Sequence, residues 1–186
     1  MINYFKNAHG LEKINAWAPN CWVSCELPDQ NDKSILINEL KIPEDYFNDI
    51  EDIDERPRIE YEDGWYLIII RIPYNNENEE IPFTTVPLGI IFKDDILVSV
   101  CFYKTELLPD FITYTQRKNR QIKDNFDLAL KLLLSSSVWF LKYLKQINHR
   151  VKIAEEKLEK SIQNEDLQTL LLIGKCLVYY NTSLKG

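Results

Sequence analysis

The feature that most constrains this fold is a long helical pattern in the C-terminal third of the chain. Apolar residues recur every three to five positions from Phe126 to Leu158, and Asp124 can cap the start of the helix. A periodic stretch of about 40 residues is longer than the helices of compact domains and is typical of a coiled-coil-like arm. We expect this helix to reach about Gln163 and a second one, over residues 167–184, to fold back as an antiparallel hairpin.

The residues before this arm predict layers of strands and helices. Strand patterns cover Ile14–Trp17, Cys21–Leu27, Arg58–Tyr61, Trp65–Ile72, Thr84–Phe92 and Ile96–Phe102, and helix patterns cover Lys33–Leu40, the segment after Pro43, and Leu107–Arg117. The run Leu67–Ile70 is apolar at every position, so its strand should be covered on both faces. We therefore expect a mixed α+β fold: an α/β/α sandwich with a mixed, largely antiparallel sheet in residues 1–123, and the helical hairpin arm in residues 124–186.

Almost all of the net negative charge lies in one short segment, Glu44–Asp63. This segment holds ten carboxylates against Arg56 and Arg58, which gives it a net charge of −8, whereas the whole chain carries −7. Concentrated carboxylates repel one another and suit hard divalent cations, which prefer oxygen ligands. The acidic segment is therefore the first place to look for a functional site.

The spacing within this segment suggests one candidate metal site. In the helix expected after Pro43, Asp45, Asp49 and Asp52 follow at i, i+4 and i+7 and would line one face. A solvated face of an amphipathic helix explains the same spacing. The residues alone leave both interpretations open.

Composition argues against several other classes of protein. A sequence pI of about 5.0 opposes nucleic-acid binding, which needs a basic surface. We find no signal peptide and no run of roughly 20 apolar residues that would cross a bilayer. The cysteines and the two histidines, His9 and His149, lack zinc-site spacing, so we expect buried reduced thiols. With no phosphate-binding glycine loop and no nucleophile beside a base, we do not expect an enzyme.

The segment from Asp49 to Ile68 resembles the cytoplasmic domain of CorA-like magnesium transporters. In that family an acidic helix leads into Arg-Pro-Lys/Arg-x-Glu and then an aliphatic strand, and here the motif is Arg56-Pro-Arg-Ile-Glu60. The strand pair near 88–102, the long helix with Asp127 near its start, and the segment 172–185 follow in the family's order. The resemblance spans roughly residues 12 to 186.

The resemblance implies the N-terminal regulatory domain of a homopentameric Mg²⁺ transporter, soluble by itself and lying on the cytoplasmic side of the membrane. Two transmembrane helices and a stalk helix would follow this sequence, so the chain is expected to be a fragment. In the family, intracellular Mg²⁺ bridges acidic groups of neighbouring subunits and holds the pore shut. Asp49, seven residues before Arg56, matches a regulatory aspartate of the family. With Asp45 and Asp52 it would form half of a regulatory site, whose partner lies on the absent stalk.

Two alternatives stay open. A zinc- or cobalt-transporting member of the same family would share this fold, so the resemblance does not fix the ion. A soluble module that oligomerises through its helical hairpin would show the same periodicity. The reading frame beyond Gly186 separates a CorA-like transporter from such a soluble module, because a transporter requires two further apolar spans of about 20 residues. We expect the fragment itself to be mostly monomeric or weakly associated.

Overall fold

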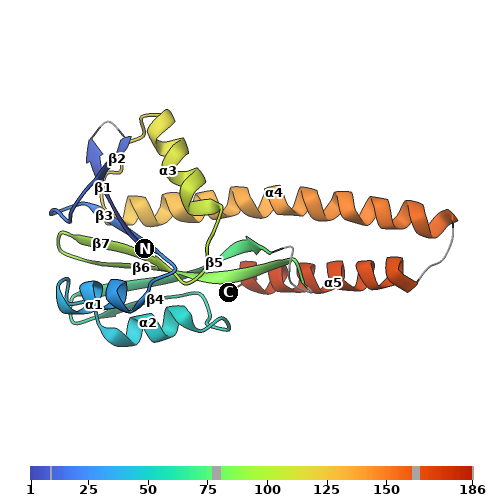
Figure 1. Ribbon diagram of the computed structural model, residues 1–186, viewed down its shortest axis with the longest axis horizontal. Helices are drawn as coiled ribbons and strands as arrows, with labels where there is room; N and C mark the ends of the chain where they lie inside the picture. The colour runs from blue at the N-terminus through green and yellow to red at the C-terminus, as the bar shows by residue number, and fades with distance from the viewer. Residues whose placement is uncertain (9, 77–80, 161–163, 186) are drawn as a thin grey trace. The chain divides into compact units, whose positions relative to one another are not determined.

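Figure 1 shows a computed structural model of the chain, which describes residues 1–8, 10–76, 81–160 and 164–185. His9, most of the expected polar loop at 75–80 and the expected helix end at Gln163 lie outside these residues. In chain order the elements are β1 (Ile2–Ala8), β2 (Gly10–Ile14), β3 (Trp22–Glu26), α1 (Gln30–Asn38), α2 (Glu44–Glu51), β4 (Arg58–Glu62), β5 (Trp65–Asn75), β6 (Phe83–Lys93), β7 (Ile96–Cys101), α3 (Leu107–Arg117), α4 (Asn125–Lys160) and α5 (Asn164–Lys185).

The strands form one seven-stranded sheet in the order β2-β1-β3-β7-β6-β5-β4. Strands β3 and β7 pair in parallel, whereas β1–β2, β1–β3, β4–β5 and β6–β7 pair antiparallel. The long connection from β3 to β7 carries two helices and three strands, as a parallel pairing requires. This confirms the expected mixed, largely antiparallel sheet.

The N-terminal strands differ from the prediction. Strands β1 and β2 were not predicted, and Ile14–Trp17 does not form a strand. The ladder between β1 and β2 ends at the pair Tyr4↔Ile14. Beyond this pair, Ile2 and Asn3 of β1 pair only with β3 on their other side, and Asn15 to Trp17 are exposed. The apolar and aromatic residues there suggested a strand, but pairing partners decide where a strand ends.

Side-chain caps mark two helix starts: α1 begins at Gln30, three residues before the predicted start at Lys33, whereas α4 begins directly after the predicted cap Asp124. The side chain of Asp29 accepts a hydrogen bond from the backbone N–H of Asp32 at 2.8 Å, and the Asp32 carboxylate accepts one from the N–H of Asp29. These reciprocal bonds form a capping box for α1. At the start of α4, Asp124 accepts from the N–H of Asp127 at 2.8 Å. Helix α3 has the bounds that the sequence predicted.

The chain divides into two compact units, Met1–Arg71 with Pro87–Ser135, called the sandwich unit below, and Ile72–Val86 with Ser136–Gly186, called the hairpin unit. Strands β5 and β6 and helix α4 contribute residues to both. The division at residue 123 expected from the sequence stays a prediction.

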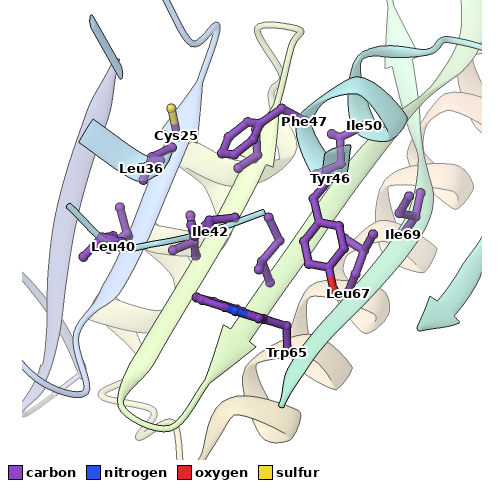
Figure 2. Packing of buried hydrophobic residues seen from close by; sticks show 14 of the residues in the cluster. Cys25, Leu36, Leu40, Ile42, Tyr46, Phe47, Ile50, Trp65, Leu67 and Ile69 are labelled. Carbon is purple, nitrogen blue, oxygen red and sulfur yellow. The ribbon is translucent and has the colours of Figure 1, made fainter. Parts of the chain in front are cut away.

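In the sandwich unit, α1 and α2 cover one face of the sheet (Figures 1 and 2). Alternate residues of each strand point to this face, as the two-residue period of a strand dictates. The core joins Leu36, Leu40, Tyr46, Phe47 and Ile50 of the helical layer to Val23, Cys25, Leu67, Ile69, Ile91, Val98 and Val100 of the sheet. Gly89 is needed here, because a Cβ at this position would lie 2.1 Å from Cδ1 of the buried Ile50.

The opposite face of the sheet is covered by α3 and the first turns of α4. Phe111 of α3 packs edge-on against Trp22 of β3, with ring centroids 5.7 Å apart. Phe126 of α4 packs edge-on against Phe92 at 4.9 Å and Tyr66 at 5.4 Å. Helices on both faces confirm the expected α/β/α sandwich.

In the hairpin unit, α5 runs antiparallel to the second part of α4. Near one end Lys157 pairs with Asp166 at 3.9 Å, and farther along the ring of Phe140 meets Tyr180 edge-on at 5.0 Å. As the residue number falls along α4 it rises along α5, so the two helices are antiparallel. The predicted helical hairpin is confirmed.

Candidate functional site

Helix α2 holds the acidic segment against the sandwich core through one face. Tyr46, Phe47 and Ile50 are buried, whereas Asp45 and Asn48 are exposed. This division follows from the helical period, which brings i, i+3 and i+4 to one side. The packing of Ile50 against Gly89 fixes the helix closely to β6. The acidic face of α2 therefore lies on a helix whose opposite face is packed against the sheet.

Asp49 lies at the edge of that acidic face and is paired with an arginine. Its Oδ2 accepts a hydrogen bond from Nη2 of Arg58 at 2.7 Å, and 35% of the Asp49 side chain is exposed. Arg58 is the first residue of β4, an edge strand that passes α2 after the turn at residues 52–57. The charge of Arg58 and its place in the Arg56-Pro-Arg-Ile-Glu60 motif were evident from the sequence, but this contact was not predicted.

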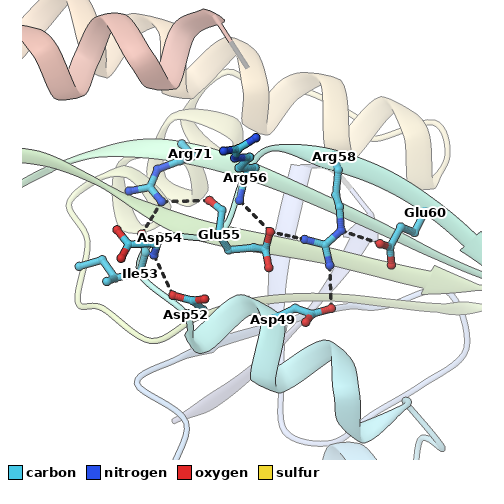
Figure 3. A network of polar contacts seen from close by, with 9 residues as sticks. All are labelled: Asp49, Asp52, Ile53, Asp54, Glu55, Arg56, Arg58, Glu60 and Arg71. Atoms are coloured by element: carbon cyan, nitrogen blue, oxygen red, sulfur yellow. Dashed lines mark hydrogen bonds and ion pairs between the residues drawn. The ribbon is translucent and has the colours of Figure 1, made fainter.

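Arg58 binds three carboxylates at once (Figure 3). Besides Asp49, its Nη1 contacts Glu55 Oε1 at 2.5 Å and its Nε contacts Glu60 Oε1 at 2.6 Å. Burial lowers the pKa of Arg58, but hydrogen bonds to Glu60 and Glu55 raise it, and the net result lies above the ordinary value. The guanidinium is a permanent positive charge inside the acidic segment.

The turn between α2 and β4 is held by a second arginine. Nη1 of Arg71 donates to the backbone carbonyl oxygens of Ile53 and Glu55, the latter at 3.1 Å (Figure 3). Burial lowers the pKa of Arg71 from its ordinary value. Because Arg71 binds backbone oxygens of Ile53 and Glu55, it fixes the path of the turn.

The position of Asp52 corrects the predicted helix face. Helix α2 ends at Glu51, and Asp52 is the C-cap with an extended backbone. Its Oδ1 accepts a hydrogen bond from the backbone N–H of Asp54 at 2.9 Å. Ile53, the next residue, is 45% exposed. The spacing predicted a longer helix, but local hydrogen bonding by Asp52 favours a turn at this point.

Across the described ranges, no three His, Cys, Asp or Glu side chains gather closely enough to hold a metal ion. Asp45 and Asp49 lie one helical turn apart, and Asp52 is directed to the turn. A carboxylate oxygen is a suitable ligand for Mg²⁺, which retains several waters and needs only one or two protein carboxylates. The carboxylate of Asp49 is thus of a chemical type that binds such a cation, and in this structure it is paired with Arg58.

The cysteines offer no competing site among the described residues. All four thiols are free and buried, as expected. Burial raises the pKa of Cys25 to about 12, and it does the same for Cys101. Both remain protonated near neutral pH, so neither is a reactive thiolate.

None of the helices, over the residues that the structure describes, is both long enough and apolar enough to cross a membrane.

Comparisons with known proteins agree with the fold and with the family that the sequence resembles. The family model described as CorA-like Mg²⁺ transporter protein matches residues 17–186. The cobalt/magnesium transport protein CorA of Methanocaldococcus jannaschii is 24% identical over 168 residues, which are 88% of this chain and 51% of that protein. The chain thus spans about half the length of this curated relative.

Solved structures show the same fold. The complete CorA magnesium transporter of M. jannaschii superposes with a TM-score of 0.85 at 22% identity, covering 99% of this chain and 59% of that one. The soluble domain of the same protein gives 0.81 at 21% identity, with 99% and 74% covered. The ZntB cytoplasmic domain of Vibrio parahaemolyticus gives 0.73 at 14% identity, with 100% and 74% covered. With nearly the whole sequence matched by the family model, this chain belongs to the CorA-like Mg²⁺ transporter family.

Proposed function

We propose that this chain is the N-terminal cytoplasmic domain of a homopentameric channel that carries Mg²⁺ across a membrane, and that it senses intracellular Mg²⁺ rather than acting as an enzyme. Family membership over residues 17–186 supports the transport role. The observation that carries the sensing role is the placement of Asp49. This carboxylate is partly exposed on a helix whose opposite face is fixed in the core.

The proposed sensor uses Asp49 as its ligand and Asp45 as a neighbouring charge. Residues i and i+4 lie on the same side of a helix, so Asp45 adds negative potential beside Asp49. Asp52 contributes less, because its Oδ1 is bonded to the turn. One or two carboxylates and several retained waters give weak binding, so the site responds at millimolar Mg²⁺. In the pentamer a neighbouring subunit supplies the remaining ligands.

Transport is tested on the protein encoded by the full reading frame. We would purify it, reconstitute it in liposomes that contain a Mg²⁺ indicator, and add Mg²⁺ outside. We expect Mg²⁺ entry that exceeds entry into protein-free liposomes and that decreases when the vesicles are preloaded with Mg²⁺. No entry of any divalent cation, or a reading frame without two apolar spans after Gly186, would contradict the proposal.

The same liposomes decide among the transported ions. The named relative is a cobalt/magnesium transport protein, and a ZntB domain shares the fold, so Co²⁺ and Zn²⁺ are the alternatives to test. Mg²⁺ is small and holds its waters strongly, whereas Zn²⁺ favours nitrogen and sulfur ligands. We expect Mg²⁺ to enter faster than Zn²⁺, and a reversed order would assign the chain to a zinc transporter.

A further inference from the structure

We draw no further inference here: the strongest candidate, the open apolar groove along α5 in the hairpin unit, lined by Leu167, Leu170, Leu171, Gly174 and Val178, is an unpartnered helix face, and nothing in the structure shows what covers it.

Discussion

The sandwich unit and the hairpin unit differ in how much of their own apolar surface they cover. In the sandwich unit, helices on both faces leave Phe47 and Ile50 at 1% and 0% exposure. In the hairpin unit, Ile173, Cys176 and Tyr180 of α5 are buried. Leu171 and Val178 of the same helix are 69% and 64% exposed. The described residues therefore complete the core of the first unit but leave one side of the second open to solvent.

The folding stability of the sandwich unit therefore depends more on its own buried side chains than that of the hairpin unit does. A fully buried side chain in a sheet-and-helix core contributes through both transfer from water and close packing. An exposed leucine on a helix contributes little to folding. Substitutions should therefore have large effects in the sandwich unit and small or opposite effects in the hairpin unit.

The largest effect is expected for Phe47→Ala. Phe47 is fully buried where α2 meets the sheet, so truncation leaves a cavity and should lower the free energy of unfolding by about 3–5 kcal/mol. Asn48→Ala, at the next and exposed position of the same helix, should change it by about 0.5 kcal/mol or less. Urea denaturation measures both. Similar losses for the two variants would mean that α2 is not anchored as described.

A smaller effect of opposite sign is expected in the hairpin unit. The Tyr180 hydroxyl is buried and has no hydrogen-bond partner among the described residues. Burial also raises the pKa of Tyr180. Tyr180→Phe removes an unsatisfied polar group and keeps the ring contact with Phe140, so we expect stability to rise by about 1 kcal/mol. A loss of stability of similar size would reveal a partner for this hydroxyl.

The smallest effect on stability is expected at Leu171. Leu171→Gln should change the free energy of unfolding by about 0.5 kcal/mol or less, because the side chain is mostly exposed. It should instead reduce the weak self-association that exposed apolar surface promotes. Light scattering over a concentration series measures this. A tight pentamer of the unmodified fragment at micromolar concentration would contradict the expected weak association.

Much of the fold could be predicted because its signals are local. The apolar run Leu67–Ile70 indicated a covered strand, and helical periodicity identified α3 and the α4–α5 hairpin. Strand β1 was missed because Lys6 and Asn7 dilute its apolar pattern, and its place in the sheet depends on pairing with β2 and β3. Pairing between strands is a property of the fold and leaves little trace in a short sequence.

The candidate site was predictable only in part for the same reason. The charge of the acidic segment and the exposure of Asp45 follow from the sequence. The ion pair between Asp49 and Arg58 depends on the position of β4 beside α2. A local sequence pattern does not predict that position. Where α2 ends, Asp52 bonds to the turn and Arg71 holds the backbone of the same turn, and helical spacing shows neither contact. Helical spacing alone overestimated how many aspartates share a face.

Thermal unfolding of the purified chain tests whether Asp49 senses Mg²⁺ as proposed. Ion binding to the native state alone raises stability by mass action, by about 1.4 kcal/mol when free Mg²⁺ is ten times its Kd. We therefore expect a modest rise in Tm over millimolar Mg²⁺.

The matched variants are Asp49→Asn and Asp94→Asn. Each removes one carboxylate, and Asp94 lies in the exposed β6–β7 turn with a positive φ that asparagine tolerates. Asp49→Asn should lose most of the rise in Tm, whereas Asp94→Asn should keep it. Equal rises in the unmodified chain and in Asp49→Asn would contradict the account and show that Asp49 is an ordinary surface charge.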